Sequence, residues 1–319
     1  MAVTLYVERE RWLDHLGATL AASPGLIPVV KGNGYGFGRE RLARLALDLG
    51  ADEIAVGTVH EVASVPAGPT VIVLTPAAGQ ELGSPLPAAA VPTVGSLTHL
   101  DALAAAGFSG RVVVKLASPM RRFGVMPSDL PDLLARLDRH GCTVHAFGLH
   151  FPLASASADH ARGVEKWLPL LPAGATLHVS HVEPQDLASL VTAHPSITFR
   201  ARVGTALWHG DKSPLRLRAG VLDWRPVAAG DRLGYRLSAV PGDGSVVMVS
   251  GGTAHGVQPL PDARSPFHFE RRRLALVEPP HMHTSMVFVP TGTPRPKPGD
   301  EVDLQRPLTQ TWVDAIVER

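Results

Sequence analysis

A glycine-rich segment, residues 31–38 with the sequence KGNGYGFG, constrains the fold of this chain more than any other feature. The residues before it, 26–30, are apolar in a way that is typical of a buried strand. The residues after it, 39–49, place leucine and alanine on one helical face and are followed by Gly50, a common helix stop. Lys31 therefore lies where a buried strand ends and a turn begins, which is where α/β folds bind their ligands.

Two interpretations of Lys31 remain open at this point. A lysine held against apolar surroundings loses its proton more easily and can attack a carbonyl carbon. A solvated lysine in an ordinary glycine turn is the simpler alternative, because such turns are common. The choice depends on which residues the rest of the fold brings to the same place.

Short apolar runs alternate with helical patterns from residue 25 to about residue 205. We expect strands at 26–30, 53–56, 70–74, 90–94, 111–116, 143–149, 176–179 and 197–203, and helices at 98–106, 130–137, 159–171 and 184–193. Eight strands that alternate with helices favour a closed parallel barrel over an open sheet. The third and fourth units are the least regular, because residues 76–92 are rich in alanine, glycine and proline.

The pattern changes after about residue 212, where strands recur without long helices. We expect these strands at 219–224, 232–239, 245–250, 274–277, 285–289, 301–304 and 312–317. Turn residues separate them, which is typical of an all-β domain. The predicted fold is therefore α/β: a (β/α)8 TIM barrel at residues 1–212, followed by a C-terminal β-domain at residues 213–319.

Composition excludes several classes of protein. The chain has 319 residues, of which 45% are apolar, so it can build a large core in one or two domains. A net charge of +1 gives no sign of binding to nucleic acid or to an anionic membrane. No apolar run approaches the ~20 residues of a membrane span, and the polar N-terminus lacks a signal-peptide pattern. A single cysteine, Cys142, excludes an internal disulfide and a cysteine-based zinc site, so we expect a cytoplasmic protein.

Basic residues and small residues gather at the ends of the predicted strands. They are Lys31 after the first strand, Lys115 and Arg122 at the fifth, His150 at the sixth, Ser180 and His181 at the seventh, and Arg202, Gly204 and Thr205 at the eighth. Taken singly, each charged residue reads as a solvated loop residue, and His150 as an ordinary core or surface histidine. Because the strand ends of a barrel share one mouth, the joint occurrence favours a site for an anionic ligand. The last two loops are the usual phosphate-binding loops of such barrels.

These residues together resemble the signature of the alanine racemase family, which uses pyridoxal 5′-phosphate and has a barrel followed by a β-domain. The resemblance implies that Lys31 holds the cofactor as a Schiff base and that Tyr35 contacts its phosphate. Arg202 matches the arginine that faces the pyridine nitrogen. Lys115 matches a lysine, often carbamylated, that orients the arginine matched by Arg122 beside the cofactor and the substrate carboxylate.

The same resemblance extends to the phosphate and the pyridine ring. Gly204 and Thr205 match backbone phosphate donors, and Ser180 or His181 falls at the phosphate-binding seventh strand. The family's cofactor-stacking histidine aligns with Pro152, so His150, two residues away, is expected to take that role. An arginine at the ring nitrogen is no proton donor at neutral pH, which favours short-lived carbanions and two bases on opposite faces.

The chain departs from the family at the second base. The family's catalytic tyrosine, contributed by the partner subunit, aligns with Thr253, whose hydroxyl is too weak a base to serve alone. The C-terminal tyrosine that reaches the phosphate in the family is also absent. Histidine has a suitable acidity, and His255, His281 and His283 lie in or near the turns that would face the barrel. We predict that His255 replaces the tyrosine.

The leading expectation is a homodimeric, pyridoxal-phosphate-dependent racemase that acts on alanine or another small amino acid. Its predicted catalytic residues are Lys31, Arg122 and His255, and no metal is assigned. One alternative is a cofactor-binding regulatory or carrier protein without turnover. Another is a metal-assisted lyase that resembles D-threonine aldolase or D-serine dehydratase and binds its metal through His281 and His283. A decarboxylase of the same fold is disfavoured, because that branch has a catalytic cysteine in its C-terminal region. The single cysteine of this chain, Cys142, lies in the barrel.

Overall fold

The computed structural model describes residues 2–76 and 86–319, and these residues form two compact units. The barrel unit comprises residues 15–34 and 38–210. The β-unit comprises the segments up to Asp14, 35–37 and 211–319. The sequence-based boundary between residues 212 and 213 stays a prediction. The two compact units differ from it, because the β-unit also includes the N-terminal segment up to Asp14 and residues 35–37.

The barrel unit contains a parallel sheet in the order β2-β9-β8-β7-β6-β5-β4-β3. The strands are β2 (Ile27–Pro28), β3 (Glu53–Val56), β4 (Thr70–Val73), β5 (Ala90–Val94), β6 (Arg111–Lys115), β7 (Thr143–Gly148), β8 (Thr176–Val179) and β9 (Thr198–Val203). A parallel bridge between Val29 and Ala55 joins the two remaining edges, and the Val30 N–H donates to the Ala55 carbonyl at 2.8 Å. The prediction of a parallel barrel is thereby confirmed.

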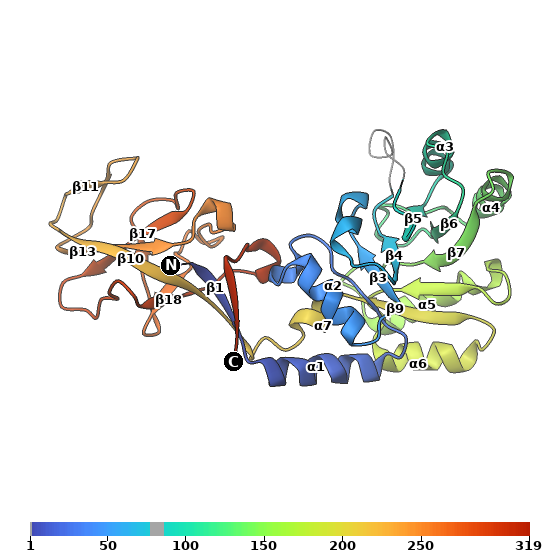
Figure 1. Cartoon of the computed structure of the whole chain (residues 1–319), viewed down its shortest axis with the longest axis horizontal. Helices are drawn as coiled ribbons and strands as arrows, with labels where there is room; N and C mark the ends of the chain where they lie inside the picture. Colours follow the sequence, from blue (N-terminus) through green and yellow to red (C-terminus); the bar gives the residue numbers. More distant parts are fainter. Residues whose placement is uncertain (1, 77–85) are drawn as a thin grey trace. The chain divides into compact units, whose positions relative to one another are not determined.

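Helices cover the outside of these strands (Figure 1). They are α1 (Arg9–Ala22), which spans the division between the units, α2 (Arg39–Asp48), α3 (Leu97–Ala105), α4 (Leu130–Arg139), α5 (Ser157–Glu165), α6 (Pro184–Ala193) and the short α7 (Thr205–His209). The expected helix at 159–171 is wrong in its second half. Helix α5 ends at Glu165, and a separate 3₁₀ turn follows at Leu168–Leu170. Pro169 disfavours the helical conformation of the residue before it and has no N–H to continue the ladder.

Irregular pieces replace helices in the early units of the barrel. A 3₁₀ helix, Val59–Ser64, follows β3, whereas an α-helix follows β2 and each strand from β5 to β9. Part of the irregular stretch at 76–92 lies outside the described residues.

The barrel interior is layered, because side chains alternate along each strand. The middle layer is apolar and consists of Ile27, Val29, Ala55, Ile72, Val91, Val113 and Ala146. Toward the amino ends of the strands lies a polar layer that includes Glu53, His145, His178 and Arg200. Burial, and then the positive charge of Arg202, lowers the pKa of His178 to about 2. Sequence patterns gave no indication of this polar layer.

The β-unit is built on a sheet whose main path runs β15-β14-β18-β10-β13-β17-β16. These strands are β10 (Leu215–Val227), β13 (Gly244–Ser250), β14 (Phe267–Phe269), β15 (Arg272–Arg273), β16 (Ala275–Leu276), β17 (Thr284–Pro290) and β18 (Glu301–Leu304). Their core includes Val221, Val247, Val249, Phe267 and Val287. The prediction of a separate all-β region is confirmed.

Two details of the β-unit differ from the sequence-based expectation. The N-terminal strand β1 (Val3–Val7) joins this sheet, pairing antiparallel with β10 and parallel with β19 (Ala315–Glu318). The expected strand at 232–239 is instead a small hairpin of β11 (Arg232–Leu233) and β12 (Ser238–Ala239). Gly234 and Leu237 take positive φ angles of 76° and 49°, which reverse the chain. Within the described residues, every helix is too short or too polar to cross a membrane.

Candidate active site

The turn that carries Lys31 is held by glycines and by one acid. Gly34 has a φ of 61°, and a side chain there would clash with the backbone nitrogen of Arg39. The two carboxylate oxygens of Glu61 accept hydrogen bonds from the Gly32 N–H at 3.1 Å and from the Gly57 N–H at 2.7 Å. Glu61 therefore fixes the position of Lys31 from the 3₁₀ helix after β3. The sequence analysis missed Glu61, because a single acid in an irregular segment carries no motif.

Lys115 and Arg202 lie close together at the carboxyl ends of β6 and β9, and both are buried. Gly148 on β7 leaves room between them, since a Cβ there would lie 3.5 Å from Arg202 Nη1 and 3.9 Å from Lys115 Cδ. The Arg202 guanidinium donates to the Leu149 carbonyl at 2.7 Å. Burial lowers the pKa of Arg202 to about 10, so it stays cationic at neutral pH.

The positive charges at this mouth repel one another. Burial, and then repulsion by Arg202, Arg122 and Lys31, lowers the pKa of Lys115 to about 6. Partial loss of hydration, and then repulsion by Arg122 and Arg202, lowers the pKa of Lys31, and Glu61 opposes this shift. Lys115 is therefore neutral at pH 7, and Lys31 is more nucleophilic than a solvated lysine.

Arg122 belongs to an exposed loop that is anchored at its far end. Leu116 and Val125 form a parallel bridge, which folds the loop back on itself. Gly124, with a φ of 128°, makes this possible, because a Cβ there would lie 2.5 Å from the Leu116 carbonyl oxygen. The Arg122 guanidinium lies 5.5 Å from the centre of the Phe123 ring.

His150 and Ser180 form a second, neutral part of the mouth. Ser180 Oγ lies 2.5 Å from His150 Nδ1, and Ser118 Oγ donates to the His150 carbonyl at 2.7 Å. Burial, and then the charges of Lys115 and Arg202, lowers the pKa of His150 to about 2. The imidazole is therefore neutral, as a ring that packs beside a cofactor should be.

His181 has a left-handed backbone, with a φ of 62°, and its ring lies 4.9 Å from that of His150. Its carbonyl accepts a hydrogen bond of 2.5 Å from Nδ1 of the buried His160, which stacks on Phe151. His160 thus fixes the loop after β8. The sequence analysis missed it, because it is one histidine on a helix with no recognisable spacing.

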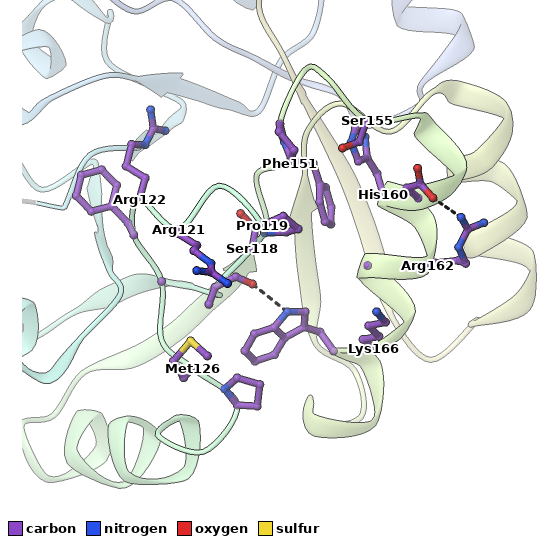
Figure 2. Close-up of a pocket in the computed structure, with 18 residues that line it drawn as sticks. Ser118, Pro119, Arg121, Arg122, Met126, Phe151, Ser155, His160, Arg162 and Lys166 are labelled. Carbon is purple, nitrogen blue, oxygen red and sulfur yellow. Dashed lines mark hydrogen bonds and ion pairs between the residues drawn. The ribbon is translucent and has the colours of Figure 1, made fainter.

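A cavity of about 780 Å³ lies between the loop after β6 and helix α5 (Figure 2). Its lining includes Arg121, Arg122, Phe151, His160 and Lys166. Trp167 closes one side, where its indole N–H donates to the Ala117 carbonyl at 3.1 Å. Arg122 therefore belongs both to the basic mouth and to a cavity with further cationic groups.

Gly204 and Thr205 lie where β9 passes into α7. The Trp208 N–H donates to the Gly204 carbonyl at 3.0 Å, and the Trp208 indole N–H donates to the Val29 carbonyl at 2.8 Å. These bonds tie the turn to the strand that leads to Lys31. The roles of Gly204 and Thr205 in phosphate binding stay a prediction.

The remaining predicted residues lie in the β-unit. Tyr35 is buried and has a φ of 55°. His255 Nδ1 accepts from the Gly252 N–H at 3.3 Å, and His255 Nε2 lies 3.2 Å from Asp314 Oδ1. Thr253 is exposed beside it. The structure thus brings seven predicted residues together in the barrel unit: Lys31, Lys115, Arg122, His150, Ser180, His181 and Arg202.

His281 and His283 are engaged separately. His281 Nε2 is hydrogen-bonded to the buried Glu278 carboxylate, and its ring faces Tyr235. The His283 ring faces His255 at 5.9 Å. A shared metal site on these two histidines therefore has no support in the described residues.

The neutral state of Lys115 gives a prediction for the protein without cofactor. Because the pKa of Lys115 falls from an ordinary value near 10.5 to about 6, the unfolded chain binds more protons between these two pH values. The free energy of unfolding should therefore rise with pH from about 6 upward. A Lys115→Met variant should show a flatter dependence and higher stability at pH 6, measured by denaturant unfolding in CO₂-free buffer. An unchanged slope would contradict the buried, neutral lysine.

Known proteins resemble this chain in sequence. The family model described as "Alanine racemase, N-terminal domain" matches residues 13–208. The alanine racemase of Mycobacterium tuberculosis is 28% identical over 327 residues, covering 91% of this chain and 84% of that protein. The alanine racemase of Mycolicibacterium vanbaalenii is 31% identical over 266 residues, covering 74% of this chain and 67% of that protein.

Solved structures agree on the fold. The alanine racemase of Bartonella henselae with covalently bound pyridoxal phosphate superposes with a TM-score of 0.73 at 17% identity, over 97% of this chain and 91% of that one. The biosynthetic alanine racemase of Pseudomonas aeruginosa gives 0.70 at 21% identity, over 100% and 99% of the two chains. On the match of the family model and of these relatives, the chain belongs to the alanine racemase family.

Proposed function

We propose that this chain is a pyridoxal-phosphate-dependent racemase that interconverts the L and D forms of alanine or another small amino acid. One observation carries the proposal: Lys31, Lys115, Arg122 and Arg202 converge at the mouth of the barrel, where burial and the charges of the two arginines lower the pKa values of both lysines. Such a concentration of cations is costly unless an anion binds there. A cofactor phosphate and a substrate carboxylate would supply the missing negative charge.

The residues present fit the cofactor. Lys31, with its lowered pKa, is suited to covalent attachment to the cofactor aldehyde. Arg202 is the buried cation that would face the ring nitrogen, and neutral His150 would pack beside the ring. The phosphate would be held by Tyr35 and by the loops with Ser180, His181, Gly204 and Thr205. When bound, the cofactor withdraws electrons from the Cα–H bond of the substrate.

The chain's own groups then handle the proton and the carboxylate. Lys31, as a neutral amine, takes or returns the Cα proton on its face of the substrate. Arg122 binds the substrate carboxylate through two parallel N–H groups. The neutral amine of Lys115 can react with CO₂, and the resulting carbamate would hold the Arg122 guanidinium in place. Arg202 is no proton donor at neutral pH and keeps the ring nitrogen unprotonated.

Racemisation also needs a base on the opposite face. We assign it to His255, because the hydroxyl of Thr253 is too weak a base. The Asp314 carboxylate accepts from His255 Nε2, which keeps the ring proton on Nε2 and leaves Nδ1 as the acceptor. The bond from the Gly252 N–H to Nδ1 is long, at 3.3 Å, and has to open for Nδ1 to take a proton. The β-domain of a partner subunit would bring this histidine to the mouth, so we propose a homodimer in the cytoplasm.

The two alternative functions lack comparable support. A carrier without turnover does not explain why the pKa values of both lysines at the mouth are lowered. A metal-assisted lyase needs His281 and His283 to share an ion, but each has a different partner.

Exchange of the α-hydrogen in heavy water tests the proposed function. With cofactor bound, L-alanine or another small amino acid should gain deuterium and the opposite configuration, measured by NMR and chiral chromatography. A His255→Ala variant should lower kcat by about 10²–10³-fold, while Thr253→Tyr, which restores the family residue, should raise it. Absence of exchange for every small amino acid would reject the racemase. Equal rates in wild type and His255→Ala would reject His255 as the second base but would leave the racemase proposal in place.

A further inference from the structure

A second cluster of ligand-type side chains lies inside the barrel, away from the catalytic mouth. Glu53 on β3, His145 on β7 and His178 on β8 present one nitrogen or oxygen atom each, and these atoms all lie within 4.8 Å of one another. They belong to the polar layer near the amino ends of the strands, whereas Lys115 and Arg202 lie at the carboxyl ends of β6 and β9. The proposed racemase reaction uses none of the three.

Hydrogen bonding in this cluster is incomplete. His178 has no exposed side-chain surface, and within the described residues neither of its ring nitrogens has a hydrogen-bond partner. The same is true of Glu53 Oε2, which faces His178 Nε2 at 3.6 Å. Buried polar atoms without partners are rare and call for a bound ion or water. Here the unpartnered atoms point toward one another.

A bulge in the backbone of β7 orients His145, the third ligand. Strand β7 has a bulge at His145, because Val112 pairs with Val144 whereas Val113 pairs with Ala146. A bulge re-aims a side chain at the cost of regular pairing. It brings His145 Nε2 to 2.9 Å from Glu53 Oε1.

We propose that Glu53, His145 and His178 form a structural site for a divalent transition metal, with Zn²⁺ as the best-suited ion. Two imidazoles and one carboxylate, with a water as the fourth ligand, are a known zinc donor set, with metal–ligand distances of about 2.0–2.2 Å. Tetrahedral geometry at these distances places ligand atoms about 3.3 Å apart. His178 Nε2 and Glu53 Oε2 are 3.6 Å apart, close to this value, and the ligand atoms of all three residues lie within 4.8 Å of one another.

Two charged residues beside the cluster, Arg200 and Arg111, determine which ligand atoms are available to the ion. Arg200 pairs with Asp52 and with Glu53 Oε1 at 3.1 Å, which leaves Oε2 for the metal. Arg111 Nη1 lies 3.3 Å from His145 Nδ1, and its Nη2 lies 3.4 Å from Thr70 Oγ1. Metal on Nε2 puts the ring proton on Nδ1, so Arg111 turns toward Thr70. Glu53 and His145 keep 10% and 14% side-chain exposure, which gives the ion a route from solvent.

The role of such a metal is structural. Residues at the amino ends of barrel strands contribute to stability, and chemistry occurs at the other end. An ion here links β3 to the neighbouring strands β7 and β8, neither of which is next to β3 in the sheet. The metal therefore cross-links the barrel across its interior.

Metal analysis of the cofactor-loaded protein tests this site. After removal of metal by a chelator and reconstitution with ZnCl₂, the wild-type protein should hold about one zinc per chain and melt at a higher temperature than the zinc-free form. His178→Ala and Glu53→Gln should lose the zinc and this shift. A His281→Ala/His283→Ala double variant is the matched control and should retain both. Arg111→Ala should tighten zinc binding several-fold.

Wild-type measurements decide the question if the buried variants do not fold. Substitution of Co²⁺ should give the visible absorption of a four-coordinate ion with nitrogen and oxygen ligands, and anomalous diffraction should place the ion between Glu53 and His178. No zinc retained by the folded wild-type protein, or zinc that persists in His178→Ala, would overturn the proposal. In that case a buried water or the Arg200 network completes the cluster.

Discussion

Lys31→Ala should abolish covalent cofactor attachment and lower racemase kcat/KM by at least about 10⁴-fold, because one residue supplies both the anchor and a base. Lys31 stands on a turn fixed by Gly34 and Glu61, and burial, followed by repulsion from Arg122 and Arg202, lowers its pKa. No other lysine of the barrel can replace it on that turn. The absorbance band of the lysine-bound cofactor and the rate of α-hydrogen exchange measure the two losses separately.

Lys212→Ala is the control for this experiment, since Lys212 is an exposed lysine outside the mouth. It should keep both the absorbance band and the exchange rate. Methylamine added to Lys31→Ala should restore a small part of the exchange by acting as a free amine. A Lys31→Ala protein that still shows the lysine-bound band would disprove the assignment and direct attention to Lys115.

The fold was predictable to the extent that local patterns determine it. Glu53–Val56, Ala90–Val94 and Thr176–Val179 are buried on both faces, so each appears in the sequence as a short apolar or mixed run between turn residues. Strand β1 was not predictable in this way. Its place between β10 and β19 depends on residues more than 200 positions away, and no local signal specifies such pairing.

The grouping of basic residues at the barrel mouth was predictable for a similar reason. A barrel brings the carboxyl ends of all its strands together, so residues that follow successive strands become neighbours without knowledge of side-chain packing. Supporting residues escaped this reasoning. Glu61 and His160 act through hydrogen bonds to backbone groups of the Gly32 and His181 turns, and such bonds leave no periodic trace. The polar layer with His178 escaped it too, because a histidine in a buried strand looks like any other core residue.

The charge of Arg202 acts on several groups at the mouth. Arg202 is buried beside Gly148, and its charge lowers the pKa values of Lys115, Lys31 and His150. A methionine at this position would remove the charge but keep the apolar bulk, so the loss of hydration around the lysines would persist. The change therefore isolates the Coulombic part of the pKa shifts from the part caused by burial.

Arg202→Met should lower racemase kcat by about 10²–10³-fold, because a fixed charge beside the reacting group is lost. It should also raise the pKa of Lys115 above about 6 and raise that of Lys31, since a positive charge no longer repels either ammonium group. The acid limb of the pH–rate profile should then move to higher pH, because the lysine ammonium groups lose their protons only at higher pH. NMR of lysine side chains labelled with ¹³C measures the pKa values directly.

Arg200→Met provides a matched comparison on the same strand. Arg200 lies two residues before Arg202 and pairs with Asp52 and Glu53 in the polar layer. Its loss should lower thermal stability while the acid limb of the pH–rate profile stays in place. If Arg200→Met and Arg202→Met shift the limb equally, the effect comes from general loosening of the barrel. If neither shifts it, the low pKa of Lys115 comes from burial alone, and the buried cation serves only to face the cofactor.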